Sequence, residues 1–268
     1  MILWKKEWKL LFLIILILGS CSENHKTLQV TRVKVDSLSQ IQLIQDSLVK
    51  PIVYTHINDL EKQPIPKAKA LFISAVLPSI LIAKHNLEME QKKIHKLKEK
   101  SKWNKEDSVY YENLKLQYKA TDIENLLKRM STVPNSIVLA QAAVESGWGQ
   151  SRFFKEGNNI FGMWSYNNNE PRIRAGLKRE NGAVHVRAYD DISQSIADYF
   201  KTLGAARAYR GLRTALQESN DPYTLLPHLK YYSEKRNVYT EQLRKMIQYN
   251  DLTKYDTYIL DPQYFVVP

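Results

Sequence analysis

The sequence predicts a mainly helical α+β fold, because most of the chain has helical periodicity and one hairpin signal interrupts it. Apolar residues recur at helical spacing from residue 67 onward. Asn181-Gly182 separates two short runs that are typical of strands. The chain has 268 residues, of which 44% are hydrophobic, so it is long enough to bury a substantial core.

The N-terminus predicts a secreted protein that stays attached to a membrane. Lysines precede the unbroken apolar run Leu10–Leu18, which is too short for a comfortable transmembrane helix. The following Leu18-Gly-Ser-Cys21 resembles a bacterial lipobox, so we interpret residues 1–21 as a lipoprotein signal peptide with a lipidated Cys21. Cys21 is the only cysteine and cannot form an internal disulfide. An uncleaved signal anchor is the alternative, and both place the protein in the cell envelope, facing the periplasm or the exterior.

Residues 22–60 are polar and weakly patterned, and we expect them to form a tether. Residues 61–130 follow as a helical N-terminal extension. Its first helix carries the apolar stripe Leu71–Val76, and Pro78 is expected to break or kink it before a second helix that continues to Leu97. Two shorter amphipathic helices complete the extension: Ser108–Tyr118 and Asp122–Met130.

Residues 131–255 form the predicted main domain, and residues 256–268 form a tail. Pro134 opens a helix that ends at Ser146, with Gly147 as its terminating residue. A loop over residues 150–169 leads to the hairpin. Asp191, with Gln194 three positions later, is expected to cap the next helix. Three more helices are predicted: Tyr209–Gln217, Pro222–Tyr231 and Val238–Tyr249.

The net charge of +11 suits an anionic partner such as nucleic acid, a membrane surface or a cell-wall polymer. Much of the excess lies in Lys92–Lys105, where interspersed acids favour a solvated helix face over a docking surface. No zinc-finger spacing or RNA-binding motif accompanies it, so we expect no nucleic acid. His185 lies on a strand and the other histidines are scattered, so we expect no metal or cofactor.

Glu145 is the strongest candidate for chemistry. It is a lone carboxylate near the end of a helix rich in small apolar residues, where desolvation is costly unless the charge is paired or used. The negative end of the helix dipole and the neighbouring Trp148 both disfavour the ionised form, which predicts a raised pKa. A carboxyl that keeps its proton near neutral pH is what glycosidic cleavage needs. An ion pair with Arg152 is the alternative.

The stretches Pro134–Gly149 and Asn159–Gly162 closely resemble glycoside hydrolase family 73, the mannosyl-glycoprotein endo-beta-N-acetylglucosaminidase-like family. Lys67–Pro78 and the segment from Tyr232 to Ile247 are similar to its Bax-type branch. The resemblance covers about residues 60–255. It implies a lysozyme-like fold with a small β-hairpin lobe and a glycan cleft. It also implies a hydrolase that cleaves β-1,4 bonds in peptidoglycan glycan strands.

The resemblance implies that Glu145 is the general acid. The family's second carboxylate lies in the hairpin, where Glu180 is the best match. The rival carboxylates are Glu156, Glu170 and Asp190. A family tyrosine maps onto Tyr239, with Tyr232 nearby, and such a phenol would orient the N-acetyl group or a water. Without a second carboxylate, the substrate's 2-acetamido group would attack the anomeric carbon. No other acid lies in an equally strong motif, which favours this second route.

Four further side chains are expected to contact sugar: Gln141, Trp164, Tyr166 and Tyr232. Gln141 lies one helical turn before Glu145, and the aromatic rings offer apolar faces to sugar rings. Trp148 and Phe161 flank tight turns and are more typical of core packing. Two other functions remain open: a lytic transglycosylase on the same fold, and a glycan-binding or scaffolding lipoprotein without catalysis.

Overall fold

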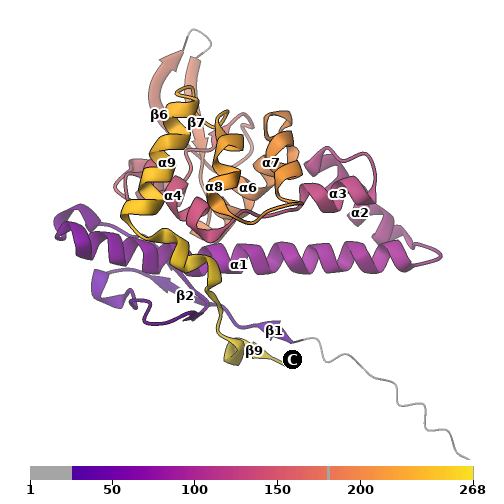
Figure 1. Cartoon of the computed structure of the whole chain (residues 1–268), viewed down its shortest axis with the longest axis horizontal. Helices are drawn as coiled ribbons and strands as arrows, with labels where there is room; N and C mark the ends of the chain where they lie inside the picture. The colour runs from indigo at the N-terminus through magenta and orange to yellow at the C-terminus, as the bar shows by residue number, and fades with distance from the viewer. Residues whose placement is uncertain (1–25, 180–181, 268) are drawn as a thin grey trace, which may run out of the picture.

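The computed structural model describes residues 26–179 and 182–267 and is organised around one long helix. Helix α1 (Ile65–Glu99) runs across the molecule, with small strands on one side and the shorter helices on the other (Figure 1). α1 is long and apolar enough to cross a membrane, but 72% of its most apolar window is buried inside the protein. This burial is typical of the core helix of a globular domain.

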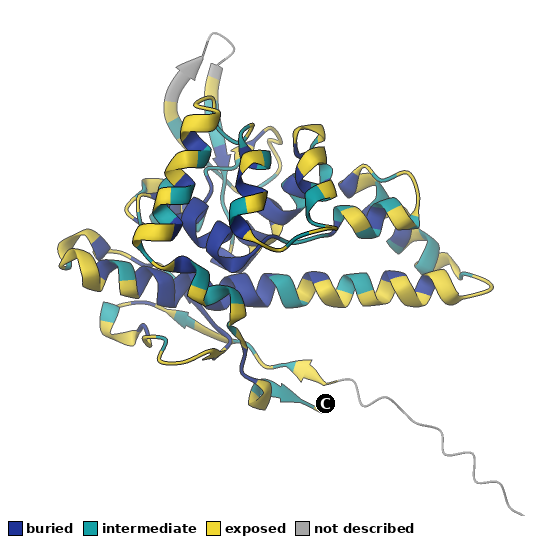
Figure 2. Cartoon of the chain, in the orientation of Figure 1, coloured by how far each residue is buried: buried dark blue, intermediate teal, exposed yellow. Residues whose placement is uncertain are grey.

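Short helices pack around the buried helix α4, which carries Glu145. The α-helices that follow α1 are α2 (Lys105–Tyr118), α3 (Ile123–Arg129), α4 (Asn135–Ser146), α5 (Arg152–Gly157), α6 (Ile192–Ala205), α7 (Arg210–Ala215), α8 (Pro222–Leu225) and α9 (Asn237–Tyr249). α4 packs against α1, α9 and the 3-10 helix η5 (Leu252–Thr257). Its alanines let these neighbours approach closely, and Figure 2 shows the buried residues concentrated where α4 meets α1.

The strands of the described residues form four small sheets. The largest has the order β5–β7–β6 and contains the antiparallel hairpin, which projects from the helices (Figure 1). Its strands are β5 (Trp164–Ser165), β6 (Arg172–Arg179) and β7 (Gly182–Arg187). Three pairs lie elsewhere: β1 (Thr27–Leu28) with β9 (Phe265–Val266), β2 (Thr31–Lys34) with β4 (Ile52–Thr55), and β3 (Leu48–Val49) with β8 (Ile259–Leu260). The remaining 3-10 helices are η1 (Leu38–Gln40), η2 (Leu60–Lys62), η3 (Arg207–Tyr209), η4 (Leu226–Leu229) and η6 (Pro262–Tyr264). This arrangement confirms the mainly helical α+β fold with a small β lobe.

The expected tether is wrong for residues 26–60. This segment forms strands β1 to β4 and buries apolar side chains against α1, among them Val53, Tyr54 and Leu60. β2 pairs with β4 in parallel, and β3 pairs with β8 from the far end of the chain. Strands of two to four residues are too short to show a periodic pattern, and their partners are distant in sequence.

The expected helix break at Pro78 is also wrong, because α1 continues through it. A proline inside a helix removes one backbone hydrogen bond, at a cost of about 3 kcal/mol or more. Pro78 lies in a stretch of α1 that is buried on all sides, from Leu71 to Ala83. Packing of this stretch holds both halves in one helix. The predicted loop over residues 150–169 likewise contains the short helix α5.

The helix ends near the candidate site agree with prediction. Asp122 and Asp191 each accept a hydrogen bond from a backbone N–H in the first turn of the following helix. Gly147 ends α4 in the left-handed conformation, with φ 60°. Two predictions lie outside the described residues: the signal peptide with Cys21, and Glu180 at the tip of the hairpin.

Candidate active site

A chain of hydrogen bonds ends at the Glu145 carboxyl. The Tyr199 hydroxyl donates to Gln141 Oε1 (2.6 Å), and Gln141 Nε2 donates to the Tyr239 oxygen (2.9 Å). The Tyr239 hydroxyl then donates to Glu145 Oε1 (2.7 Å). The donors run in one direction along this series, which ends at Glu145 Oε1. The second oxygen, Oε2, is therefore the one that can hold the acid proton and meet a substrate.

The Glu-Ser-Gly-Trp-Gly motif forms the sharp turn that places Glu145 at the end of α4. Three successive residues adopt the left-handed conformation: Gly147 (φ 60°), Trp148 (φ 58°) and Gly149 (φ 80°). Ser146 Oγ accepts from the Gly149 N–H (2.8 Å) and closes the turn. A Cβ on Gly149 would lie 2.8 Å from Leu60, so only glycine fits there. The motif therefore ends the helix one residue after the acid.

The surroundings of Glu145 favour its protonated form. Burial raises the pKa of the Glu145 carboxyl, and the hydrogen bond from Tyr239 opposes this without cancelling it. Burial, together with the nearby Glu145 charge, also raises the pKa of Tyr239, which therefore stays a hydrogen-bond donor. Arg152 pairs with Glu156 (2.9 Å), so the alternative ion pair with Glu145 does not form. The predicted rise in the Glu145 pKa agrees in direction.

Glu145 lies in the wall of an open groove of about 480 Å³. The groove is lined by Glu145, Phe161, Gly162, Met163, Trp164, Tyr166, Arg187, Thr202, Tyr209 and Tyr232. Glu145 is the only carboxylate among these described lining residues. Trp164 and Tyr166 are 38% and 85% exposed, with ring centroids 6.3 Å apart. The groove therefore combines one acid with exposed aromatic faces.

The structure corrects the expected placement of two residues. Gln141 is fully buried and does not line the groove, because its amide is used between Tyr199 and Tyr239. Tyr239 is also buried and contacts Glu145 instead of the open space. Tyr232 does line the groove, and its ring stacks on that of Tyr239 (5.8 Å, 7°). The Tyr232 hydroxyl has no hydrogen-bond partner among the described residues.

The Asn-Ile-Phe-Gly turn forms another part of the groove wall. Asn159 Nδ2 donates to the carbonyls of Met163 (3.0 Å) and Arg187 (2.8 Å), and Asn159 Oδ1 accepts from the Met163 N–H (2.9 Å). These bonds join the turn to strand β7. Phe161 stacks on Tyr199 (4.3 Å) as expected for core packing, yet it also lines the groove. Sequence reasoning missed four lining residues, which no local motif marks: Met163, Arg187, Thr202 and Tyr209.

Residues 120–252 match the family described as mannosyl-glycoprotein endo-beta-N-acetylglucosaminidase. The chain carries a glucosaminidase domain. It is accordingly a glycoside hydrolase, as the resemblance implied. Helices α1 and α2 lie outside the matched segment.

Curated relatives share parts of the chain. The Bax protein of Escherichia coli K12 is 28% identical over 211 residues, which are 72% of this chain and 73% of Bax. The peptidoglycan hydrolase FlgJ of the same strain is 31% identical over 101 residues, and the match spans 34% of this chain and 32% of FlgJ. FlgJ of Salmonella typhimurium is 29% identical over 135 residues, covering 46% of this chain and 42% of FlgJ.

Two solved structures are also similar. The catalytic domain of the autolysin Auto from Listeria monocytogenes is 22% identical, with a TM-score of 0.39, covering 62% of this chain and 97% of that domain. The glycoside hydrolase domain of Salmonella typhimurium FlgJ is 22% identical, with a TM-score of 0.37, covering 53% of this chain and 90% of that domain.

None of the rival carboxylates that the structure describes lines the groove. Glu156 pairs with Arg152, and Glu170 lies 3.3 Å from Arg187 Nε. Asp190 is exposed and accepts a hydrogen bond from Gln194 Nε2 (3.1 Å). These positions leave Glu180, outside the described residues, as the remaining candidate from the sequence.

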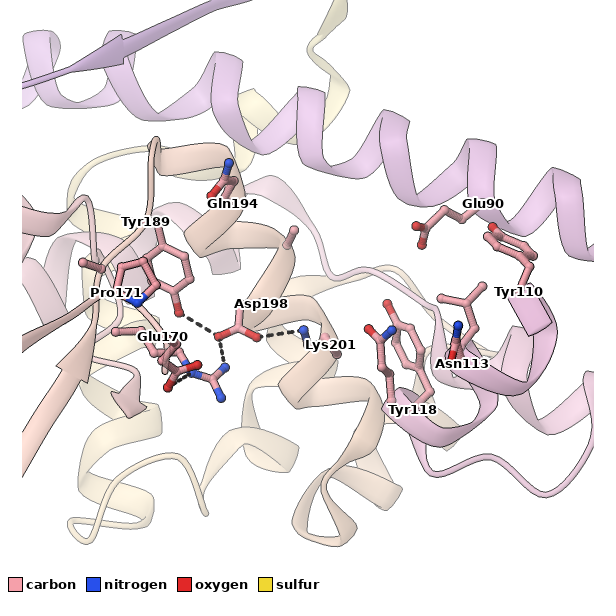
Figure 3. A pocket seen from close by; sticks show the side chains of 15 residues that line it. Glu90, Tyr110, Asn113, Tyr118, Glu170, Pro171, Tyr189, Gln194, Asp198 and Lys201 are labelled. Atoms are coloured by element: carbon pink, nitrogen blue, oxygen red, sulfur yellow. Dashed lines mark hydrogen bonds and ion pairs between the residues drawn. The ribbon is translucent and has the colours of Figure 1, made fainter. Parts of the chain in front are cut away.

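A second charged cluster of the glucosaminidase domain surrounds Asp198 (Figure 3). Asp198 Oδ2 accepts from Arg187 (2.5 Å) and from the Tyr189 hydroxyl (2.7 Å), and Lys201 lies 3.2 Å from Oδ1. Burial alone would raise the pKa of Asp198. The Tyr189 hydrogen bond and the charges of Lys201 and Arg187 outweigh it and hold the pKa below its usual range.

No cluster of histidine, cysteine and acidic side chains suited to a metal ion occurs in the described part of the chain. His185 lies on β7, where its Nδ1 is 3.1 Å from the carbonyl of Ala183.

Proposed function

We propose that the protein is a peptidoglycan hydrolase of the endo-β-N-acetylglucosaminidase type, with Glu145 as its general acid. One observation carries the proposal: a carboxyl with a raised pKa lies in the wall of an open groove, and a buried donor chain holds one of its oxygens. The family match supports glycosidic cleavage. The relatives FlgJ of Escherichia coli and of Salmonella typhimurium are peptidoglycan hydrolases by name, which supports the substrate class.

In the proposed mechanism, Glu145 Oε2 gives its proton to the glycosidic oxygen as the bond breaks. Positive charge then develops at the anomeric carbon. The Tyr239 hydrogen bond keeps the carboxyl in one orientation during this transfer and stabilises the carboxylate that results. Water then adds its oxygen to the anomeric carbon and releases one proton, which restores the acid form of Glu145 directly or through solvent.

Two routes remain for the second half of the reaction. A carboxylate such as Glu180 would activate the water, or the 2-acetamido group of the sugar would attack first. We favour the acetamido route, because the described groove walls offer no carboxylate besides Glu145. Of the two tyrosines, Tyr232 lines the groove, whereas the Tyr239 hydroxyl is committed to Glu145.

Digestion of purified peptidoglycan by the wild type and by Glu145→Gln tests this function, with mass spectrometry of the products. We expect the wild type to release fragments with reducing N-acetylglucosamine ends, and Glu145→Gln to release almost none while folding normally. Glu241→Gln is the matched control, because Glu241 is an exposed acid of α9 paired with Arg244. Products with 1,6-anhydromuramic ends would instead identify a lytic transglycosylase. Unchanged clearing by Glu145→Gln would identify a binding protein.

We also propose that a lipid on Cys21 anchors the protein in the bacterial cell envelope. The proposal rests on the charged, apolar and small-residue order of residues 1–21. Growth with a labelled fatty acid tests it: the wild type should take up label and fractionate with membranes, and Cys21→Ser should do neither. Label that persists in Cys21→Ser would contradict the proposal.

A further inference from the structure

A second pocket, of about 650 Å³, lies beside the groove and has two walls of different origin. Residues of α1 and α2 form one wall, and Figure 3 shows Glu90, Tyr110 and Tyr118 on this side. The other wall comes from the glucosaminidase domain and includes Arg187 and Lys201. Because α1 and α2 lie outside the family match, the helical extension completes a pocket that residues 120–252 alone would leave open. Its volume falls in the range of about 300–1,000 Å³ that is typical of ligand sites.

The pocket and the groove meet at Arg187, which lines both. On α6, Lys201 lines the pocket while the next residue, Thr202, lines the groove. A ligand whose main chain lies in the groove beside Glu145 can therefore extend a side branch past Arg187 into the pocket. This shared boundary places the pocket beside the groove that holds the substrate.

The wall formed by the extension presents an unpaired acid. Glu90 is half-buried and forms no hydrogen bond or ion pair with the described residues. The positive charges that lower its pKa are those of Lys201 and Lys93. Lys93 lies over the ring of Tyr110, 3.6 Å from its centroid. Burial raises the pKa of Glu90, and these cations oppose it only in part. A partly desolvated carboxylate is costly unless a cation binds it, so an ammonium group is the ligand chemistry that fits this wall.

The opposite wall offers hydrogen-bond donors to an anion. Arg187 uses Nε toward Glu170 and one terminal nitrogen toward Asp198, which leaves part of its five-donor fork free. The Lys201 ammonium has three donors, and its ion pair with Asp198 uses one of them. Both cations are about one third exposed. Glu170 and Asp198 line the same wall and already hold these two cations, so an anion would bind to the donors that they leave free.

We propose that this pocket binds the stem peptide that branches from the glycan strand. Glu90 pairs with the free ammonium group of the peptide's diamino acid, and Lys201 and Arg187 donate to a peptide carboxylate. The inference rests on the proposed function, because it assigns the branch of the same substrate. A bare sugar chain lacks the ammonium group that Glu90 requires, whereas a short peptide carries both charged groups.

Two glycan substrates test the inference: strands that keep their stem peptides, and strands from which an amidase has removed them. We expect Glu90→Gln to lower kcat/KM about 3- to 10-fold on the peptide-bearing strands, the range for losing one charged contact, and to leave cleavage of the bare strands unchanged. Glu88→Gln is the control, because Glu88 is an exposed acid of the same helix paired with Lys92. Equal effects of Glu90→Gln on both substrates, or equal effects of the two variants, would overturn the inference.

Calorimetry with a free stem tetrapeptide separates this inference from the proposed function. We expect the wild type and Glu88→Gln to bind the peptide, Glu90→Gln to bind it about 3- to 10-fold more weakly, and acetylation of the peptide's side-chain amine to have the same effect. No binding by the wild type, or indifference to both changes, would refute the pocket assignment even if glycan is cleaved. Peptide binding without glycan cleavage would refute the proposed function and leave the pocket assignment intact.

Discussion

The carboxylate of Glu145 and that of Asp198 differ in the charges around them. Glu145 accepts one hydrogen bond, from Tyr239, and forms no ion pair with the described residues. Asp198 accepts a hydrogen bond from Tyr189 and lies against two cations, Arg187 and Lys201. Burial alone would raise the pKa of both acids, but their full surroundings act in opposite directions: the Glu145 pKa is raised and the Asp198 pKa is lowered.

Cations therefore decide which of the two buried acids keeps a proton. Asp198 is ionised and ties α6 to strand β7 through Arg187. Glu145 is left with a single neutral donor and an open groove in front of it. The first arrangement suits a structural ion pair, and the second suits proton transfer to a bound substrate.

The largest expected effect is on kcat, which should fall far more when Glu145 is replaced than when Asp198 is replaced. Glu145→Gln should lower kcat on peptidoglycan about 10²- to 10⁴-fold, because general acid catalysis contributes that much. Asp198→Asn should keep kcat within about tenfold of the wild type, because Asp198 does not line the groove. The measurement is initial-rate kinetics on purified glycan strands. A loss in Asp198→Asn that matches the loss in Glu145→Gln would break the comparison.

Stability should change in the opposite order. Asp198→Asn should lower the free energy of unfolding by about 2–4 kcal/mol, because it leaves Arg187 and Lys201 without their buried partner. Glu145→Gln should be neutral or stabilising by up to about 1 kcal/mol, because it removes a carboxylate that burial disfavours. Urea unfolding at neutral pH measures both. A larger stability loss in Glu145→Gln than in Asp198→Asn would show that Glu145 has a structural role.

The pH dependence of stability should also have opposite signs. Because the folded-state pKa of Glu145 lies above its ordinary value of 4.5, its contribution is present below pH 4.5 and is lost as pH rises through the folded pKa. The contribution of Asp198 is present above its ordinary pKa of 3.8 and is lost as pH falls through its lowered folded pKa. The advantage of Glu145→Gln over the wild type should therefore grow with rising pH, and the deficit of Asp198→Asn should shrink in acid. Unfolding curves collected across this pH range check both slopes, and parallel curves for both variants would contradict the assigned shifts.

Sequence reasoning found the acid because its neighbours along the chain define it. The turn from Gly147 to Gly149 and the Asn159 turn are local, so their motifs can be read directly. The Asp198 cluster was missed because Arg187 ends strand β7 and Tyr189 follows it, whereas Asp198 and Lys201 lie on helix α6, and only folding brings them together. Contacts between segments that are distant in the sequence leave no periodic pattern in it.

The same reason explains the errors in the fold. β3 pairs with β8, so Leu48 lies beside Ile259, and neither two-residue strand is recognisable alone. Pro78 was assigned to a helix break from local propensity, but burial along the centre of α1 overrides that propensity. The role expected of Gln141 changed because spacing places a residue on a helix face without showing what covers that face.

The smallest expected effect tests the one donor that Glu145 has. Tyr239→Phe removes a hydrogen bond that favours the ionised carboxylate, so the pKa of Glu145 should rise and the alkaline limb of the kcat profile should move to higher pH. We expect kcat at the optimum to fall about 2- to 10-fold, which corresponds to one hydrogen bond of about 0.5–1.5 kcal/mol.

Tyr232→Phe is the matched control for this shift, because its ring stacks on Tyr239 but its hydroxyl has no partner among the described residues. It should leave the alkaline limb in place, because no hydrogen bond joins the Tyr232 hydroxyl to Glu145. A limb that moves to lower pH in Tyr239→Phe, or that moves equally in both variants, would show that the phenol of Tyr239 does not set the protonation of Glu145. Each acid accepts a hydrogen bond from one phenol, Tyr239 for Glu145 and Tyr189 for Asp198, and only Asp198 has cations beside it. If the phenol of Tyr239 has no effect, the opposite pKa shifts of the two acids would need a different explanation.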